Sequence, residues 1–283
     1  MPVDRDRSRL LLRRLDRLVS LVAEKPLPEN IHRFRTCTRR VETLLETLVP
    51  IADRKQRKLL KLLGRLRRTA GRVRDVDVQS AALRGLKIPQ EAERKAQLLR
   101  TLAELRCKRE KKLLRTLEEE KVREVQKRLK KVAGTLPFSA NTLDPLAEAR
   151  RRFVEMARHH GVLTEELLHR YRIEGKRVRY VAELAEASPE AGQMVAELVR
   201  LQDRLGDWHD WLLLSGTAQE LFHDGANSAL AAALRNLTRA KFREAAHVVQ
   251  EVREALLKPP GAGMPGARRK AAGNVPGPAA AVA

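Results

Sequence analysis

The sequence predicts an all-α protein in which two pseudo-symmetric helical bundles, related by tandem duplication, surround a basic central cleft. Apolar residues recur at helical spacing along almost the whole chain, and no segment alternates with the period of two that indicates a strand. Hydrophobic residues make up 43% of the 283 residues and are mostly Leu, Ala and Val, of which Leu and Ala favour helices. Two sequence patterns also occur twice, in the same order.

In the first half, proline and glycine interrupt the helical pattern and set the predicted helix ends. The helices expected there cover residues 5–23, 30–48, 53–69, 75–84 and 90–133, with a break allowed inside the last. In the second half they cover residues 143–160, 164–187, 189–205, 207–222 and 227–257. We therefore expect one helical domain over residues 1–258, with halves of about 1–134 and 141–258. The Pro/Gly/Ala-rich tail, residues 259–283, should be disordered.

The net charge is strongly positive, at +22, because 58 Lys and Arg face 36 Asp and Glu. Such an excess attracts polyanions such as nucleic acid, anionic membranes or phosphate polymers. The N-terminus has no apolar signal segment, and no run of apolar residues is long enough to span a membrane. We expect a cytoplasmic protein without a membrane partner. Cys37 and Cys107 each fall inside a helical pattern, where we expect small buried side chains and not a disulfide or zinc site.

The first repeated pattern is HRFRTCTRR, beginning at His32, which recurs as HRYRIEGKR, beginning at His169. The second is RLRRTAGRVRD, which ends at Asp75 and recurs as RLQDRLGDWHD, ending at Asp210. Two matches in the same order and at nearly the same offset indicate a duplication. The pair His209-Asp210 is not part of the repeated pattern, because Arg74 stands where His209 does.

The first pattern predicts a cationic stripe on a helix in each half. Residues three, four and seven positions apart share a helical face. The stripes comprise His32, Arg35 and Arg39 in the first half and His169, Arg172, Lys176 and Arg179 in the second. Arginine forks match phosphate oxygens, and each histidine should be neutral because arginines and a helix N-terminus lie nearby. Two such stripes would line a groove suited to a chain of phosphates.

The second pattern ends on an aspartate in each half, Asp75 and Asp210. We expect each to stand at the start of the next helix, where a carboxylate suits the helix dipole. Its role would be to cap that helix or to orient an arginine of the stripe, and not to take part in catalysis.

At these residues the chain resembles the CHAD family, the conserved histidine α-helical domain. The resemblance covers roughly residues 5–258 and rests on IHRFRTCTRRVETLL, GRVRDVDV, LHRYRIEGKRVRYVAEL and LQDRLGDWHD. It implies two pseudo-symmetric bundles around a basic cleft, binding of inorganic polyphosphate and association with polyphosphate granules. Separately, we expect no cofactor and no metal. The binding residues that the resemblance implies are His32, Arg35, Arg39, Arg40, His169, Arg172, Lys176, Arg177 and Arg179. The chain departs from the family at Thr36-Cys37-Thr38 and at Trp208-His209, neither of which belongs to the stripes.

The sequence is also compatible with other functions. A nucleic-acid-binding helical protein would share the charge, but aromatic residues for base stacking make up only 3% of the chain. We expect weak, non-specific contacts with nucleic acid from charge alone. A metal-dependent phosphohydrolase is suggested loosely by His209-Asp210 with His169 and Asp224, although a cationic stripe disfavours a divalent metal. A helical scaffold with incidental charge would not explain the repeated stripe. We therefore expect a non-catalytic binding module.

Overall fold

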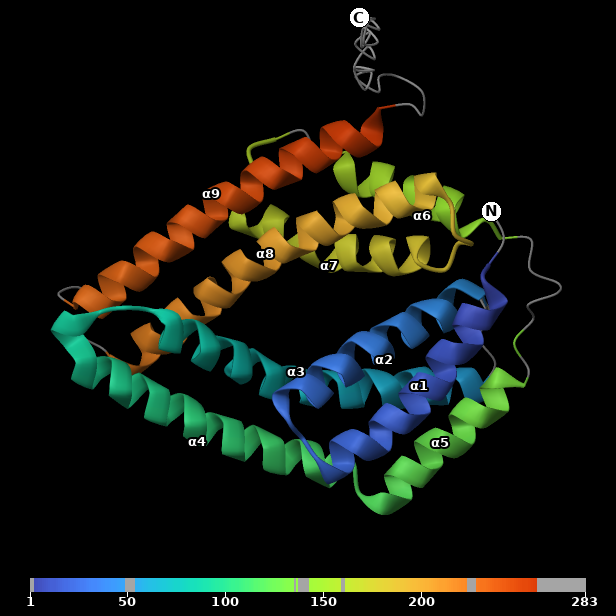
Figure 1. Ribbon diagram of the computed structural model, residues 1–283, viewed down its shortest axis with the longest axis horizontal. Coiled ribbons are helices and arrows are strands. Elements are labelled where there is room, and N and C mark those ends of the chain that lie inside the picture. Colours follow the sequence, from blue (N-terminus) through green and yellow to red (C-terminus); the bar gives the residue numbers. More distant parts are fainter. Residues whose placement is uncertain are drawn as a thin grey trace, which may run out of the picture.

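The computed structural model describes residues 3–48, 54–134, 136, 143–158, 161–222 and 228–258, and in these residues nine α-helices form (Figure 1). Apart from an isolated bridge between Val3 and Ala185, they contain no strand pairing, so the predicted all-α class is confirmed. The helices are α1 (Arg5–Glu24), α2 (Pro28–Leu48), α3 (Arg54–Gly85), α4 (Ala92–Thr116), α5 (Glu119–Ala133), α6 (Pro145–Ala157), α7 (Glu165–Ala182), α8 (Pro189–Leu221) and α9 (Ala229–Leu257), with a 3-10 turn η1 (Pro89–Glu91) before α4.

Several helices begin at a side chain that accepts a hydrogen bond from a backbone N–H of the first turn. Asp4 accepts from Arg7 at the start of α1, and Thr164 accepts from Leu167 at the start of α7. Ser188 serves α8 in the same way. These caps satisfy donors that a helix cannot satisfy internally, and they fix where the helices start.

Two predicted helix breaks, at Gly71 and Gly206, are wrong, because α3 and α8 each continue through the glycine. A single glycine costs a helix only about 1 kcal/mol relative to alanine. Buried residues on both sides, such as Val73 after Gly71 and Leu205 before Gly206, keep the helix packed. The long segment predicted over residues 90–133 is broken, as allowed, between α4 and α5.

Buried side chains gather in three clusters. The first joins α1, α2, the first part of α3 and α5, around Leu15, Phe34 and Leu63. The second joins α6, α7, α8 and α9, around Tyr171 and Trp208. The third lies where the ends of α3 and α8 meet α4 and the start of α9, at the left of Figure 1. This third cluster therefore joins the first part of the chain, α1–α5, to the second part, α6–α9, at that end of the molecule.

Direct helix contacts also join the two parts, since α2 packs against α7 and α3 against α8. At the other end of the molecule, the backbone N–H of Asp4 donates to the carbonyl of Leu184 at 2.9 Å. Among the described residues no helix is long and apolar enough to span a membrane. Cys37 is buried as predicted, but Cys107 is exposed, so that part of the prediction is wrong. The tail predicted to be disordered lies outside the described residues.

Candidate functional site

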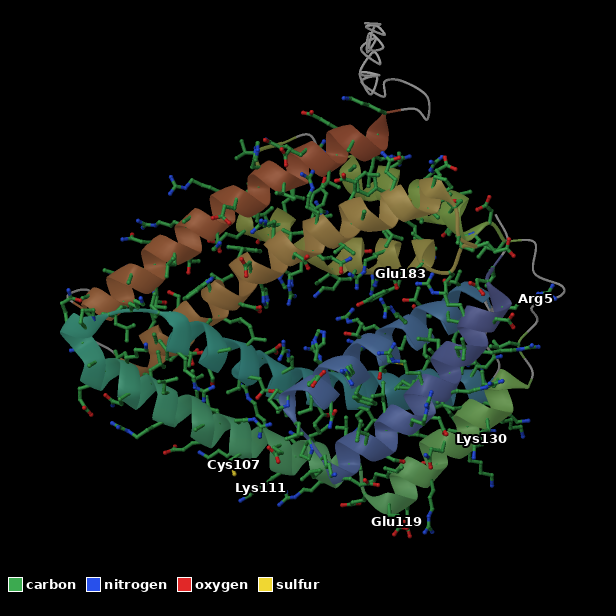
Figure 2. The ribbon with its side chains drawn as sticks, viewed as in Figure 1. Arg5, Cys107, Lys111, Glu119, Lys130 and Glu183 are labelled. Atoms are coloured by element: carbon green, nitrogen blue, oxygen red, sulfur yellow. The ribbon has the colours of Figure 1, made fainter. Side chains whose placement is uncertain are left out.

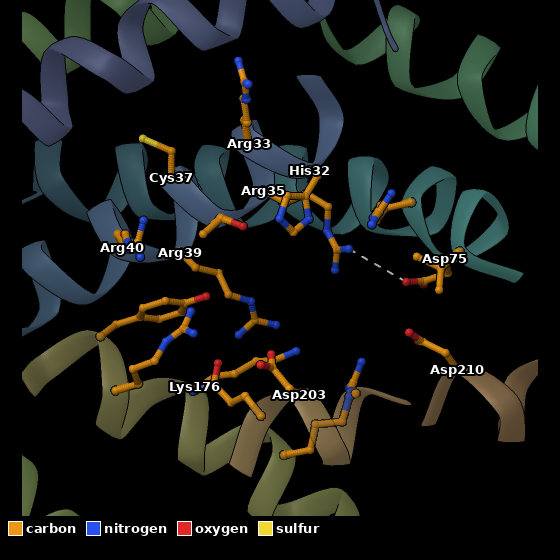
Figure 3. A pocket seen from close by; sticks show the side chains of 18 of the residues that line it. His32, Arg33, Arg35, Cys37, Arg39, Arg40, Asp75, Lys176, Asp203 and Asp210 are labelled. Carbon is orange, nitrogen blue, oxygen red and sulfur yellow. Dashed lines mark ion pairs between the residues drawn. The ribbon is translucent and has the colours of Figure 1, made fainter. Parts of the chain in front are cut away.

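A cavity of about 770 Å³ lies where α1, α2 and α3 face α7 and α8. Figure 3 shows Arg39 of α2 pointing across it toward the helices that carry Lys176 and Asp203. Cations dominate the lining, which also contains His32 and four aspartates. The cationic lining residues are Arg14, Arg33, Arg35, Arg39, Arg40, Arg74, Arg172, Lys176 and Arg179, and the aspartates are Asp75, Asp203, Asp207 and Asp210.

The cavity brings together most of the residues predicted to form the stripes. Those that line it are His32, Arg35, Arg39, Arg40, Arg172, Lys176 and Arg179. His169 and Arg177 are not among its lining residues. Arg177 is exposed, and its Nη1 donates to Oε1 of Glu174 on the same helix at 2.9 Å. Because it directly follows Lys176, it is rotated by about 100° around α7, away from the stripe.

The guanidinium of Arg35 packs against α3 at Gly71. A Cβ at Gly71 would lie 3.4 Å from Nη2 and 3.5 Å from Nε of Arg35, so the arginine rests against the backbone of α3. Its Nη1 lies 3.9 Å from Oδ1 of Asp75. The glycine of the repeated pattern thus lies against an arginine in the first half. In the second half, a Cβ at Gly206 would meet nothing within 4 Å.

Arg35 and Arg172, which occupy equivalent positions in the repeated pattern, have an unsatisfied donor in common. In each, Nε is buried and has no hydrogen-bond partner among the described residues. Burial also lowers the pKa of both guanidinium groups. The charge of Arg172 lowers the pKa of Arg35 further, and both arginines lower the pKa of Lys176. A buried unpaired N–H costs about 1–3 kcal/mol. Both arginine side chains line the cavity and are partly exposed, so an anion bound there would compensate their charges.

Lys176 has the most strongly shifted pKa of the cavity. Burial first, and then the charges of Arg172, Arg39 and Arg35, lower the pKa of its amine to about 7, while Asp210 opposes the shift. Lys176 forms no ion pair among the described residues. Its amine is therefore held next to three arginines without a carboxylate partner, an arrangement that an incoming anion would stabilise.

Arg40 lines the cavity but is already bound to a carboxylate. Its Nε and Nη2 donate to Glu183 at 2.6 and 3.0 Å, and hydrogen bonding with Glu183 raises its pKa against the effect of burial. Arg179 approaches the same carboxylate at 3.4 Å, and both guanidinium groups lie over the ring of Tyr180. This group of four side chains connects α2 with the end of α7.

The two repeated histidines have different surroundings. Burial and the charges of Arg74, Arg35 and Lys176 lower the pKa of His32, which favours the neutral form predicted from the sequence. His169 stacks on His209 with ring centroids 5.6 Å apart. Its pKa is lowered by burial, then by His209 and Arg172. Because the cavity takes in His32 and leaves out His169, the two halves contribute unequally.

The predicted placement of Asp75 and Asp210 at helix starts is wrong, because both lie well inside continuous helices, α3 and α8. The alternative, an acceptor that orients an arginine, agrees with the 3.9 Å approach of Asp75 to Arg35. Asp210 makes no such approach to Arg172, although its charge raises the pKa of Arg172 and of Lys176.

Sequence reasoning missed several lining residues. Arg74 stood in the repeated pattern opposite His209 and could have been found there. Asp203 and Asp207 occupy positions where the first copy has Arg68 and Arg72, so a comparison of charges between the copies would have singled them out. Arg14 carried no signal, because it comes from α1, which lies outside both patterns.

The fold and the site together define an all-helical protein with a cation-lined cavity between two groups of helices. The sequence profile of the CHAD domain matches residues 8–219, which is most of the chain. The chain therefore belongs to the CHAD domain family, as the resemblance of its motifs indicated.

Two solved structures resemble it over most of their length. One is the crystal structure of the CHAD domain from the plant Ricinus communis, with 19% identity, a TM-score of 0.63 and coverage of 87% of this chain and 88% of that one. The other is PptA from Streptomyces chartreusis, with 18% identity, a TM-score of 0.66 and coverage of 91% and 100%. At these identities the likeness shows the fold. No curated protein sequence matches the chain.

Proposed function

We propose that this protein is a non-catalytic module that binds inorganic polyphosphate in the cavity, which acts as a basic cleft between two pseudo-symmetric halves. The observation that carries the proposal is the pair Arg35 and Arg172, which line the cavity and whose nearest ion-pair partner among the described residues is Asp75, at 3.9 Å from Arg35. They lie in one cavity with Lys176 and Arg39, which have no ion pair among the described residues. Donors and charges left unused in this way suit an anion with several oxygens.

The positions of the repeated residues support the pseudo-symmetry. His32 and His169 stand equally far from the first residues of α2 and α7. The same holds for Asp75 and Asp210 in α3 and α8. The helices that carry corresponding patterns also pack against each other, α2 against α7 and α3 against α8. A pseudo-twofold between these pairs would place two phosphate-binding stripes along one continuous path.

The chemistry of the lining favours a phosphate chain over nucleic acid. Guanidinium groups bind phosphate oxygens through two parallel hydrogen bonds. Among the described lining residues, Tyr180 is the one aromatic side chain, and Arg40 and Arg179 already cover it. A binder of single-stranded nucleic acid needs exposed aromatic faces on which bases stack. Membership of the CHAD family, with the polyphosphate binding that the resemblance implies, supports the same choice. In cells we expect it to associate with polyphosphate granules.

Calorimetric titration with polyphosphate tests the proposal. We expect tight binding whose affinity falls steeply with added salt, and much weaker binding to DNA of equal total charge. The double variant Arg35→Gln/Arg172→Gln should lose affinity by about 100-fold or more, since each charge-assisted hydrogen bond contributes about 1.5–3 kcal/mol.

Arg268→Gln/Arg269→Gln is the matched control, because it removes the same charge from the tail and not from the cavity. Its affinity should stay close to that of the parent protein. Equal affinity for DNA and polyphosphate, or equal losses in the two double variants, would contradict the proposal.

The enzyme alternative is tested by incubation with polyphosphate and Mg²⁺ or Mn²⁺. Of the residues that suggested it, Asp224 lies outside the described residues, and His209 and His169 stack on each other. Among the described residues, no three His, Cys, Asp or Glu side chains are placed to hold a metal ion. Release of orthophosphate that depends on His209 would show that the module is catalytic.

A further inference from the structure

Six cations follow one another along α3 at alternating intervals of four and three residues. We call them the α3 track, and they are Arg54, Lys58, Lys61, Arg65, Arg68 and Arg72. All six are exposed. At 1.5 Å per residue they extend over roughly 27 Å of helix. A surface of this length and uniform charge is much longer than the region of α3 that lines the cavity, where Arg74, Asp75 and Val78 lie.

Within the described part of the chain, no carboxylate is paired with the charges of the track. None of its six side chains forms an ion pair with another described residue. Two exposed arginines elsewhere do so with a glutamate on their own helix, in the pairs Arg123–Glu119 and Arg151–Glu148. Like charges three or four residues apart destabilise a helix by about 0.2–0.5 kcal/mol per pair. An uncompensated row is therefore unfavourable in the free protein, and a bound polyanion would relieve it.

The track leads to the cavity. The next position at the same spacing is Asp75, which lines the cavity and faces Arg35. A strict seven-residue spacing drifts by about 20° per repeat around a straight helix. The row therefore winds gradually around α3, from the exposed surface at Arg54 to the cavity at Asp75. Close to this end, Nη1 of Arg109 on α4 donates to the carbonyl of Arg72 at 2.8 Å and adds another cation.

The corresponding face of α8 has no such track. The positions equivalent by the repeat are Pro189, Gln193, Ala196, Arg200, Asp203 and Asp207. The single cation among them, Arg200, is paired with Glu197 and Glu251. Asp203 and Asp207 line the cavity. A polyanion that leaves the cavity is therefore attracted along α3 and repelled along α8.

We propose that the α3 track is a second polyphosphate-binding surface, which holds the part of a long polymer that emerges from the cavity. The proposal rests on the proposed function, since the cavity must hold one part of the same chain. Short polyphosphate occupies the cavity alone, whereas long polyphosphate occupies the cavity and the track. The protein therefore prefers long chains, and the polymer leaves the cavity in one direction.

The experiment compares tripolyphosphate with long-chain polyphosphate by calorimetry. The track variant is Lys58→Glu/Lys61→Glu/Arg65→Glu, at exposed positions whose side chains form no ion pair with another described residue. The fold should therefore persist, and circular dichroism checks it. The control variant, Lys111→Glu/Lys112→Glu/Arg115→Glu, makes the same change in net charge on α4, at the outer edge where Figure 2 labels Lys111. We expect the track variant to lose on the order of tenfold or more in affinity for the long polymer, with a smaller salt dependence. Its affinity for tripolyphosphate should stay within about twofold of the control's.

The outcomes distinguish failure of the proposed function from failure of the α3 track as a binding surface. Failure of the unaltered protein to bind tripolyphosphate and the long polymer would overturn both. The track and control variants could instead bind tripolyphosphate but lose equal affinity for the long polymer. That result would overturn the α3 track as a second binding surface and would not contradict the proposed function. The same titration with DNA completes the experiment. If the track variant loses affinity for DNA but not for long polyphosphate, the surface binds nucleic acid, and the α3 track as a polyphosphate-binding surface is overturned.

Discussion

Lys176 faces Arg35 and Arg39 across the cavity and follows Arg172 by one turn of α7, and its pKa of about 7 results from burial and these three charges. Asp210 of α8 is the carboxylate that opposes the shift. Above pH 7 the amine of the free protein is mostly neutral. A bound anion raises its pKa, so binding at that pH requires the uptake of a proton.

We therefore predict that affinity for tripolyphosphate falls as the pH rises above 7, by up to about tenfold per pH unit, until the pKa of the complex is reached. Calorimetry in buffers of different ionisation enthalpy measures the proton uptake directly. The variant Lys176→Arg should bind without this uptake, because arginine stays charged. Since the ligand's own titration is common to both proteins, identical pH profiles would contradict the prediction.

Arg40 and Arg177 show that the repeated motif does not determine whether a single residue faces the cavity or is already bound to a carboxylate. Both belong to the predicted set, each directly after a residue of the stripe. Arg177 is rotated away from the cavity, which helical geometry could have indicated. Arg40 reaches the cavity, but it is bound by Glu183, which lies 143 residues further along the chain. Sequence spacing carries no information on such a distant partner.

At the scale of elements, α3 and α8 are the helices whose continuity the sequence misjudged. Glycine signals a break by its intrinsic flexibility, but tertiary packing on both sides of Gly71 and Gly206 outweighs a cost of about 1 kcal/mol. Continuity places Arg74 and Asp75 on the same rigid helix as the α3 track, and Asp203, Asp207 and Asp210 on one face of α8.

This continuity predicts that Gly206→Ala stabilises the protein by about 0.5–1 kcal/mol, because the added methyl group meets open space and alanine favours helix. Urea unfolding measures the change. Gly175→Ala is the contrast, since its Cβ would lie 3.3 Å from Cδ2 of Leu201 where α7 packs on α8, and it should gain less or lose stability. A loss of stability in Gly206→Ala would show that α8 is not a continuous helix there.

At the scale of the whole molecule, the cavity exists because the two parts of the chain are joined at both of its ends. One join is the apolar cluster at the ends of α3 and α8. The other is polar, where Glu183, whose side chain is 8% exposed, binds Arg40 and approaches Arg179. Opening either end would change the spacing of the cations across the cavity.

We predict that Glu183→Gln lowers the free energy of unfolding by about 2–4 kcal/mol, because it leaves two partly buried guanidinium groups without a carboxylate. The matched control is Glu190→Gln, whose ion pair with Arg150 is exposed and should contribute less than about 1 kcal/mol. Equal stability of the two variants would mean that this contact does not hold the halves together.

The sequence was sufficient to predict the helical class, most helix bounds and the helix faces that carry the two stripes, because helical periodicity and charge spacing are local properties of the chain. It also placed His32, Arg35, Arg39, Arg172, Lys176 and Arg179 on faces that the structure brings to one cavity. Three features could be seen only in the folded chain: Glu183 binds Arg40, His169 stacks on His209, and four aspartates share the cavity. These contacts join residues far apart in the chain, and the packing of α2 on α7 and of α3 on α8 determines them.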